Sequence, residues 1–445
     1  MIVSSSPTYR AMGFAVALIL AGSASLVARQ SLTFTPELHA WDLLFRVRGR
    51  LPVRADFVLI AEDSKSIGAL GRPPWPRRLY ADVVRVVRRA NPRVMVLDRF
   101  FEQRDRERPG SDAALWKALA AARDVFLPVL HRTLPPRETS REDLRGLVAL
   151  EKSTVDQQFI RLTTTPDYAW LGFRPPVSDF AVSARGMGVA TTDQSADADG
   201  VVRRTRAGWV TPIAYPASPP LPEPSKLSGD TGVVPGLPVI AAAFALNVDK
   251  HALSYTFGER LLIAGSLKPP VFVPIDALGN MIINYVGPAG TIRHYSMVDV
   301  ARGQVPASAF KGKVVFIGPT AGAAEEAQPL PTPYGPMPRV EITANAVHSI
   351  LERNSLFLGP LRSSLGCLLA FGLALGIMVP PFRLRIGLLV TLALLLLYLA
   401  LAVVSLRVWH VLLPIIPAVL LAVLFSLAAL ALRAALGEGR AVGRE

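Results

Sequence analysis

Four apolar runs, each about as long as a bilayer is thick, constrain this chain more than any other feature. The first covers residues 11–28, and three more follow one another near the C-terminus at 363–381, 386–406 and 411–432. A helix of 18 residues spans roughly 27 Å, close to the thickness of the hydrocarbon core. None of the four runs contains a charged residue. Each is therefore predicted to be a transmembrane helix, and Pro414 and Pro417 are predicted to kink the last one.

Arginines beside these runs predict their orientation. Arg10 precedes the first run, Arg383 and Arg385 lie in the loop between the second and third, and Arg433 follows the fourth. Positive residues concentrate on the cytoplasmic side, which places residues 1–10 and 433–445 in the cytoplasm and residues 29–362 outside it. The chain is thus predicted to be a multi-pass protein of the inner (cytoplasmic) membrane, with a large domain in the periplasm or outside.

The first run has a second interpretation, a cleaved signal peptide. Its positive N-terminal flank and its small residues at 22–25 agree with that interpretation. Its length and the lack of a small-x-small cleavage site at its end favour a helix that stays attached.

Composition and motifs exclude several functional classes. The net charge is +14, but arginine is scattered and interleaved with acidic residues, so no nucleic-acid partner is predicted. Cys367 is the single cysteine, which rules out an intrachain disulfide. The six histidines share no ligand spacing, and no phosphate loop or nucleophile elbow occurs. We therefore predict no metal, no cofactor and no enzymatic activity.

The exported segment begins with alternating strand and helix patterns. Short apolar runs at 57–61, 94–97 and 125–130 read as buried strands, and residues 77–90 and 112–123 have helical spacing. Such alternation predicts an α/β domain with a mostly parallel central sheet. Residues 131–165 and the proline-rich 212–238 are predicted to be irregular and exposed. Further predicted strands are 188–191, 201–210, 261–264, 271–274, 281–285 and 313–318, followed by a helix at 341–353.

Polar residues at the ends of the first two strands are the candidate ligand site. Asp63 and Asp98 each follow an apolar strand, and Trp75 and Arg77 lie in the PPWPRR loop after the first. Ligand crevices of open α/β sheets lie outside the carboxyl ends of the strands. The alternative is internal: Asp63 would pair with Arg77 or Arg78, and Asp98 would cap a helix or pair with an arginine.

A second acidic group precedes Gly200 and is followed by two arginines. Asp193, Asp197 and Asp199 could offer oxygen ligands to a cation, since calcium prefers such ligands. The spacing fits no EF-hand, so a turn of Asp-Gly type is the favoured interpretation.

Several blocks of the exported segment resemble the type-two CHASE domain family. These blocks are WDLLFRVRG (41–49), FVLIAEDSKSIGALGRPPWPRRLYADVV (57–84), PRVMVLDRFF (92–101), DADGVVRRTR (197–206), PIDALGNMIINYVGP (274–288), KVVFIGPTAGAAEE (313–326) and PMPRVEITANAVHSIL (336–351). The blocks contain Asp199, Arg203, Glu341 and Asn345, which become candidates for a structural or signalling role. The family's last block usually reads Gly-Val-Glu-x-His-Ala-Asn, so Thr343 stands where a histidine is expected. A second departure is Ala61-Glu62, where an Asp-rich pair is expected.

The resemblance implies an extracytoplasmic sensor that acts on a cytoplasmic adenylate cyclase, diguanylate cyclase or kinase. Thirteen residues follow the last apolar run, too few for an output domain. The output is therefore expected either in a partner protein or in further sequence of the same polypeptide. The implied partners are an extracytoplasmic ligand or protein, the lipid bilayer and a second copy of the chain in a homodimer.

Two other functions remain open from the sequence. The exported domain could belong to a membrane scaffold or assembly subunit that binds a protein partner. An exported hydrolase is the weakest hypothesis, because no nucleophile–base pair can be assigned.

Overall fold

The structure is a computed structural model of the 445-residue chain. It describes residues 35–131, 145, 149–150, 153–156, 160–161, 173–191, 195–212, 231–322, 327–358, 361–379 and 384–442. The chain forms two compact units. Residues Arg50–Ser355 form an α/β unit, and Met1–Gly49 together with Leu356–Glu445 form a helical unit.

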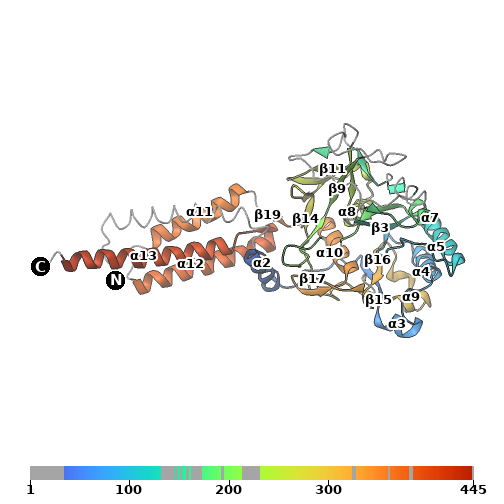
Figure 1. The fold of residues 1–445 in the computed structure, drawn as a ribbon, viewed down its shortest axis with the longest axis horizontal. Coiled ribbons are helices and arrows are strands. Elements are labelled where there is room, and N and C mark those ends of the chain that lie inside the picture. The colour runs from blue at the N-terminus through green and yellow to red at the C-terminus, as the bar shows by residue number, and fades with distance from the viewer. Residues whose placement is uncertain are drawn as a thin grey trace. The chain divides into compact units, whose positions relative to one another are not determined.

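The α/β unit is built on one central sheet, as Figure 1 shows. Its strand order is β15-β1-β16-β2-β3-β7, and all of these neighbours run parallel. Only β6 (Phe173–Arg174), which pairs with β3, is antiparallel. The predicted mostly parallel sheet is thus confirmed. Its parallel strands are β1 (Phe57–Glu62), β2 (Val94–Leu97), β3 (Val125–His131), β7 (Gly186–Val189), β15 (His294–Ser296) and β16 (Val314–Pro319).

Helices cover both faces of this sheet because its strands are apolar on both sides. In β1, Val58 and Ile60 join one core while Phe57 and Leu59 join the other, as expected when successive side chains alternate between faces. The first core is closed by α3 (Ser64–Leu70), α4 (Arg77–Arg89), α5 (Pro109–Ala122), α7 (Ser178–Ser183) and α9 (Met297–Ala301). The second is closed by α8 (Leu237–Ala245) and α10 (Arg339–Leu351).

Smaller sheets surround this core. One sheet has three strands, in the order β4 (Val155–Asp156), β10 (Thr231–Pro235) and β9 (Gly208–Pro212). Another has four strands, in the order β13 (Val271–Pro274), β12 (Arg260–Ile263), β11 (Leu253–Thr256) and β5 (Ile160–Arg161). Two are antiparallel pairs: β8 (Arg204–Arg206) with β14 (Asn280–Ile282), and β17 (Leu330–Thr332) with β18 (Gly335–Met337).

Two predictions in this region were wrong. The expected strand at 201–210 is divided into β8 and β9 at Ala207, where the chain passes close to its neighbours. A Cβ on Gly208 would lie 2.5 Å from the Val233 side chain, so only glycine fits there. The end of the predicted exposed segment 212–238 is instead buried, as β10 and the start of α8. Its prolines Pro235 and Pro238 occupy a strand end and a first helical turn, where a missing N–H costs little. Residues 213–230, and most of 131–165, lie outside the described residues.

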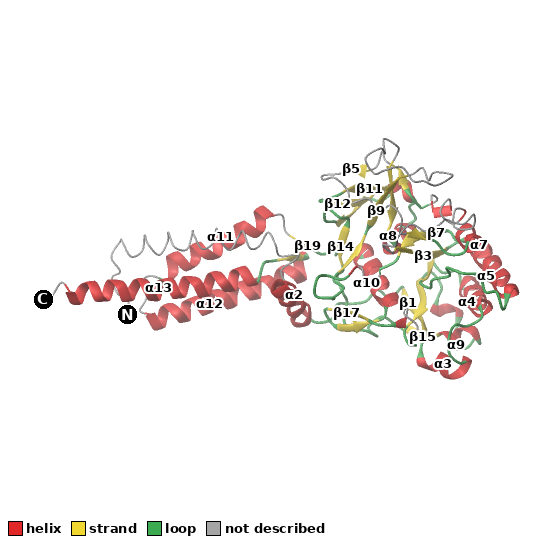
Figure 2. Cartoon of the chain, in the orientation of Figure 1, coloured by secondary structure: helices red, strands yellow, loops and turns green. Residues whose placement is uncertain are grey.

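The helical unit contains α2 (Thr35–Arg48), α11 (Leu361–Met378), α12 (Leu384–Val404) and α13 (Ile416–Val442), drawn as helices in Figure 2. Within the described residues, the one helical segment long and apolar enough to cross a membrane is Leu384–Trp409. The apolar parts of α11 and α13, Gly366–Met378 and Ile416–Ala431, are shorter. The run at 11–28 lies outside the described residues. The structure thus contains one clear candidate span, and the four-helix prediction is not confirmed.

The last apolar run departs from its predicted form. Val411–Leu412 form a short strand, β20, parallel to β19 (Phe357–Leu358), and α13 begins only at Ile416. Pro414 therefore precedes the helix and Pro417 lies in its first turn, where proline is tolerated. The predicted kink at these prolines was wrong, because neither lies in the helix interior.

Candidate functional site

The strand-end residue Asp63 caps a helix. Its Oδ1 accepts hydrogen bonds from the Ser66 backbone N–H and from the Ser296 hydroxyl, both at 2.8 Å. Burial acts to raise the pKa of Asp63, but these hydrogen bonds outweigh it and hold the pKa below its usual range. Such an N-cap stabilises the start of α3.

Trp75 and Arg77 have partners of their own. The Trp75 indole N–H donates to the Gly71 carbonyl at 2.8 Å, and the ring belongs to the first core. Arg77 pairs with Asp112 at 2.5 Å and also donates to the Gln103 carbonyl. The predicted alternative, a pair of Asp63 with Arg77 or Arg78, was wrong. The Arg77 guanidinium pairs with Asp112 on α5, and the Asp63 carboxylate accepts from Ser66 and Ser296.

Asp98 is fully buried at the end of β2. Its carboxylate accepts hydrogen bonds from Arg339 at 3.2 Å and from the Thr343 hydroxyl at 2.9 Å, both on α10. Asp63 and Asp98 do not follow neighbouring strands, because β16 lies between β1 and β2. These contacts favour the internal role, and contact of Asp63, Trp75, Arg77 or Asp98 with a ligand stays a prediction.

Glu341 and Asn345, also on α10, hold the loop at 286–292. The Glu341 carboxylate accepts from the Gly290 N–H at 2.9 Å, and the Asn345 side-chain oxygen accepts from the Val286 N–H at 2.9 Å. Burial raises the pKa of Glu341, although the backbone N–H donors oppose this. Both side chains thus fasten a loop to a helix.

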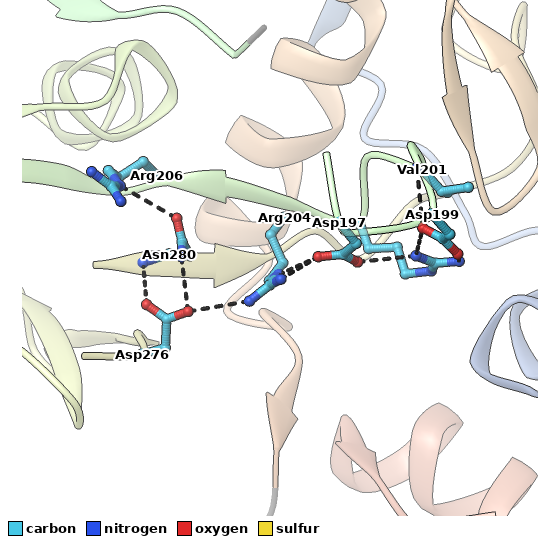
Figure 3. A network of polar contacts seen from close by, with 8 residues as sticks. Asp197, Asp199, Val201, Arg204, Arg206, Asp276 and Asn280 are labelled. Atoms are coloured by element: carbon cyan, nitrogen blue, oxygen red, sulfur yellow. Dashed lines mark hydrogen bonds and ion pairs between the residues drawn. The ribbon is translucent and has the colours of Figure 1, made fainter. Parts of the chain in front are cut away.

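Asp197, Asp199 and Arg203 form a buried ion cluster, part of the network shown in Figure 3. The Arg203 side chain is 2% exposed and pairs with Asp197 at 3.0 Å and with Asp199 at 2.8 Å. The backbone angle φ of Gly200 is +78°, in the left-handed region that favours glycine. The Asp199 carboxylate accepts a hydrogen bond from the Val201 N–H at 3.2 Å. The two carboxylates face arginines and shape a turn, which favours the turn over the cation site; Asp193 lies outside the described residues.

The same network continues onto β8 and β14. Arg204 binds Asp197 at 2.7 Å and Asp276 at 3.3 Å. Asn280 donates to Asp276 at 2.8 Å and accepts from Arg206 at 3.5 Å. Figure 3 shows this chain of contacts running from Arg206 through Asp276 to Asp197. Arg204 and Asn280 are therefore held in place before any ligand arrives.

A cavity of about 200 Å³ opens beside this network. Trp209 on β9 lines it, with the Arg206 guanidinium 3.6 Å from its ring and the His131 ring stacked at 4.0 Å. The Trp209 indole N–H is buried and has no acceptor among the described residues. A concave site with convergent polar groups and apolar walls is the usual form of a small-molecule site. Six of its lining residues are His131, Val189, Arg204, Arg206, Trp209 and Asn280.

Sequence reasoning missed this cavity, although one signal was present. Arg204 and Arg206 are two apart on a strand, a spacing that places both side chains on one face. His131, Trp209 and Asn280 come from three other strands and share no motif.

A family model of the CHASE2 domain matches residues 14–379. The chain belongs to the CHASE2 domain family. CHASE2 domains are extracytoplasmic sensor domains of signalling proteins, and they are sensory and not catalytic. No curated protein and no solved structure gave a significant match.

Thr343 stands where the CHASE2 family usually has a histidine, and the structure shows what the threonine contacts. This residue is fully buried and donates to Asp98, whereas the cavity is lined by residues of other elements. Among the described residues, replacement of the expected histidine thus changes a contact inside the CHASE2 core.

Proposed function

We propose that this CHASE2 protein is a multi-pass sensor of a bacterial inner membrane, which relays an extracytoplasmic cue through its helices to an output of cyclase or kinase type. The output would lie in a partner protein or in further sequence of the same polypeptide. The family match over residues 14–379 carries this proposal. The matched range includes the sensor domain and most of the apolar runs 11–28 and 363–381 that flank the domain. The proposed topology is four spans at 11–28, 363–381, 386–406 and 411–432, with residues 29–362 outside and 1–10 and 433–445 in the cytoplasm.

Exposed apolar side chains on the helical unit support a membrane location. Leucines on α12 such as Leu389 and Leu397 are more than 60% exposed, and Leu427 on α13 is 56% exposed. Contiguous apolar surface of this kind is costly in water and is expected to face lipid.

Glu37 supports the relay. It lies on α2, which follows the first apolar run, and its carboxylate accepts from the Ile415 and Ile416 N–H groups at 2.7 Å each. These groups lie at the N-terminus of α13, where a negative charge is favoured by the helix dipole. Glu37 is fully buried. A shift of α2 would therefore be transmitted directly to the last helix of the unit.

Reporter fusions test the topology. Alkaline phosphatase fused after Arg50 is expected to be active, and the same enzyme fused after Arg433 is expected to be inactive, because it folds only outside the cytoplasm. A fluorescent protein that matures only in the cytoplasm should give the opposite pattern. Equal activity of the phosphatase at both positions would end the four-span topology.

A fused output domain tests the relay. We expect Glu37→Ala to change cyclic AMP production at least about 5-fold when an adenylate cyclase catalytic domain is joined after Glu445, since coupling between sites is typically 1–3 kcal/mol. Cyclic AMP is measured in a host lacking its own cyclase, at matched protein levels. Glu352→Ala, which removes a half-exposed partner of Arg54, is the matched control and should leave output unchanged. Unchanged cyclic AMP production by the Glu37→Ala variant would favour the alternative, a scaffold that binds a protein partner.

A further inference from the structure

Helix α2 exposes apolar side chains on the face that its own unit does not cover. On the covered face, Leu38, Trp41 and Leu44 are at most 6% exposed. Leu43 and Val47 are four residues apart, and therefore on one face of the helix, and they are 60% and 61% exposed. Single exposed apolar side chains are common on soluble proteins. The position of α2 within the helical unit therefore has to show what covers this face.

Both ends of α2 lie beside the segment that follows the candidate span Leu384–Trp409. Near the start of α2, the Glu37 carboxylate accepts from two backbone N–H groups at the beginning of α13. At the last residue of α2, Arg48 interacts electrostatically with His410. Between these ends, α2 contacts the π-helix Ser405–Trp409 that closes the span. The helix therefore lies across one end of the span and does not run along it.

This end of the span has the features of a membrane–water interface. The charge-free stretch 386–406, between Arg385 and Arg407, is about 32 Å long as a helix, which matches a hydrocarbon core of about 30 Å. Arg407 is exposed, and Trp409 is 60% exposed. Tryptophan is enriched at the headgroup level, and arginine near a helix end extends its charge towards the headgroups. Because α2 contacts this end, it lies at the same level.

Chain length and charge agree with this position. Residues 29–34 link the apolar run 11–28 to α2, and such a link reaches at most about 25 Å. A span that begins in the cytoplasm at Arg10 would therefore deliver α2 close to the outer membrane surface. The exposed residues of α2 include no carboxylate, because Glu37 and Asp42 are buried. A face without negative charge suits a layer of lipid phosphates.

We infer that α2 is an interfacial helix, which lies in the outer headgroup layer and directs Leu43 and Val47 into the lipid acyl chains. The partner of this face is the bilayer itself. The inference rests on the proposed function, since the proposed topology decides which leaflet α2 contacts. Lipid contact at α2 adds to that topology a helix that lies in the membrane surface without crossing it.

Spin labels on single cysteines test the inference in the full chain, held in nanodiscs of phosphatidylethanolamine and phosphatidylglycerol. Cys367→Ser removes the single native cysteine, and Leu43→Cys or Val47→Cys then carries the label. The measurement is the ratio of label accessibility to a polar nickel chelate over accessibility to oxygen. We expect this ratio to be at least about fivefold lower at both positions than at Leu278→Cys, because polar solutes are excluded from hydrocarbon. Leu278 is the matched control, a leucine of the α/β unit that is 51% exposed.

The replaced side chains are exposed, so both variants should keep the melting temperature of Cys367→Ser. A ratio at either position equal to that at Leu278→Cys would overturn the inference. Low accessibility to both reagents would overturn it as well, since protein would then cover the face, and spin–spin broadening would identify that protein as a second copy of the chain.

A label on α12 keeps failure of the inference apart from failure of the proposed function. Leu397 is 66% exposed, and Leu397→Cys should show the low ratio of a lipid-facing position. A high ratio at Leu397→Cys would refute the membrane location itself. A low ratio there, together with high ratios at Leu43→Cys and Val47→Cys, would refute only the interfacial helix.

Discussion

Replacement of Asp98 with alanine is expected to lower the free energy of unfolding of the α/β unit by about 3–5 kcal/mol. Asp98 is fully buried, and the change would leave the Arg339 guanidinium in the core without its carboxylate. Thr343 would lose its acceptor at the same time. In a unit of this size the loss corresponds to roughly 6–15 °C in Tm. The measurement is thermal unfolding of the solubilised full chain, followed by tryptophan fluorescence.

Two further variants separate a buried pair from a ligand contact. Asp98→Ala combined with Arg339→Met removes both charges, and should recover part of the lost stability. Asp63→Ala removes a helix cap and the acceptor of the Ser296 hydroxyl, and should cost about 1–2 kcal/mol. If Asp98→Ala melted like the wild type, the internal role of Asp98 would be refuted and a ligand role would gain weight.

Arg203→Met is expected to have an effect of similar size, about 3–5 kcal/mol at neutral pH. The substitution leaves the carboxylates of Asp197 and Asp199 close together and buried, with Arg204 as the remaining described cation beside Asp197. Burial and mutual repulsion would raise the pKa values of both carboxyl groups in the folded variant. The loss of unfolding free energy caused by Arg203→Met is therefore largest above those raised pKa values. It becomes smaller as the pH falls towards about 4, because the carboxyl groups become neutral.

The pH dependence makes this prediction specific. The difference in Tm between wild type and Arg203→Met, measured at pH 7.5 and again near pH 4.5, should be clearly smaller at the lower pH. Arg260→Met is the control at the surface of the same unit, with no carboxylate among its described partners, and should show a small difference at both values. A deficit independent of pH would mean that lost packing, and not unpaired charge, causes the destabilisation.

The sequence by itself determined the class of fold and the first strands of the central sheet. Residues 94–97 form β2 as predicted, and the strands predicted at 57–61 and 125–130 each extend by one residue. Continuous apolar runs of this length leave few alternatives to a strand buried on both faces. Local patterning therefore sufficed for the parallel sheet and for the CHASE2 resemblance, which the family match confirms.

Tertiary structure alone decided which elements meet. The insertion of β16 between β1 and β2 brings together residues more than two hundred positions apart, and no local pattern encodes that pairing. The partners of Asp98 are likewise on α10, and the cavity collects side chains from β3, β8, β9 and β14. Propensity and periodicity act over a few residues, whereas a site depends on long-range packing. The partners of the candidate residues at the strand ends, and the set of residues that line the cavity, could therefore not be predicted from the sequence.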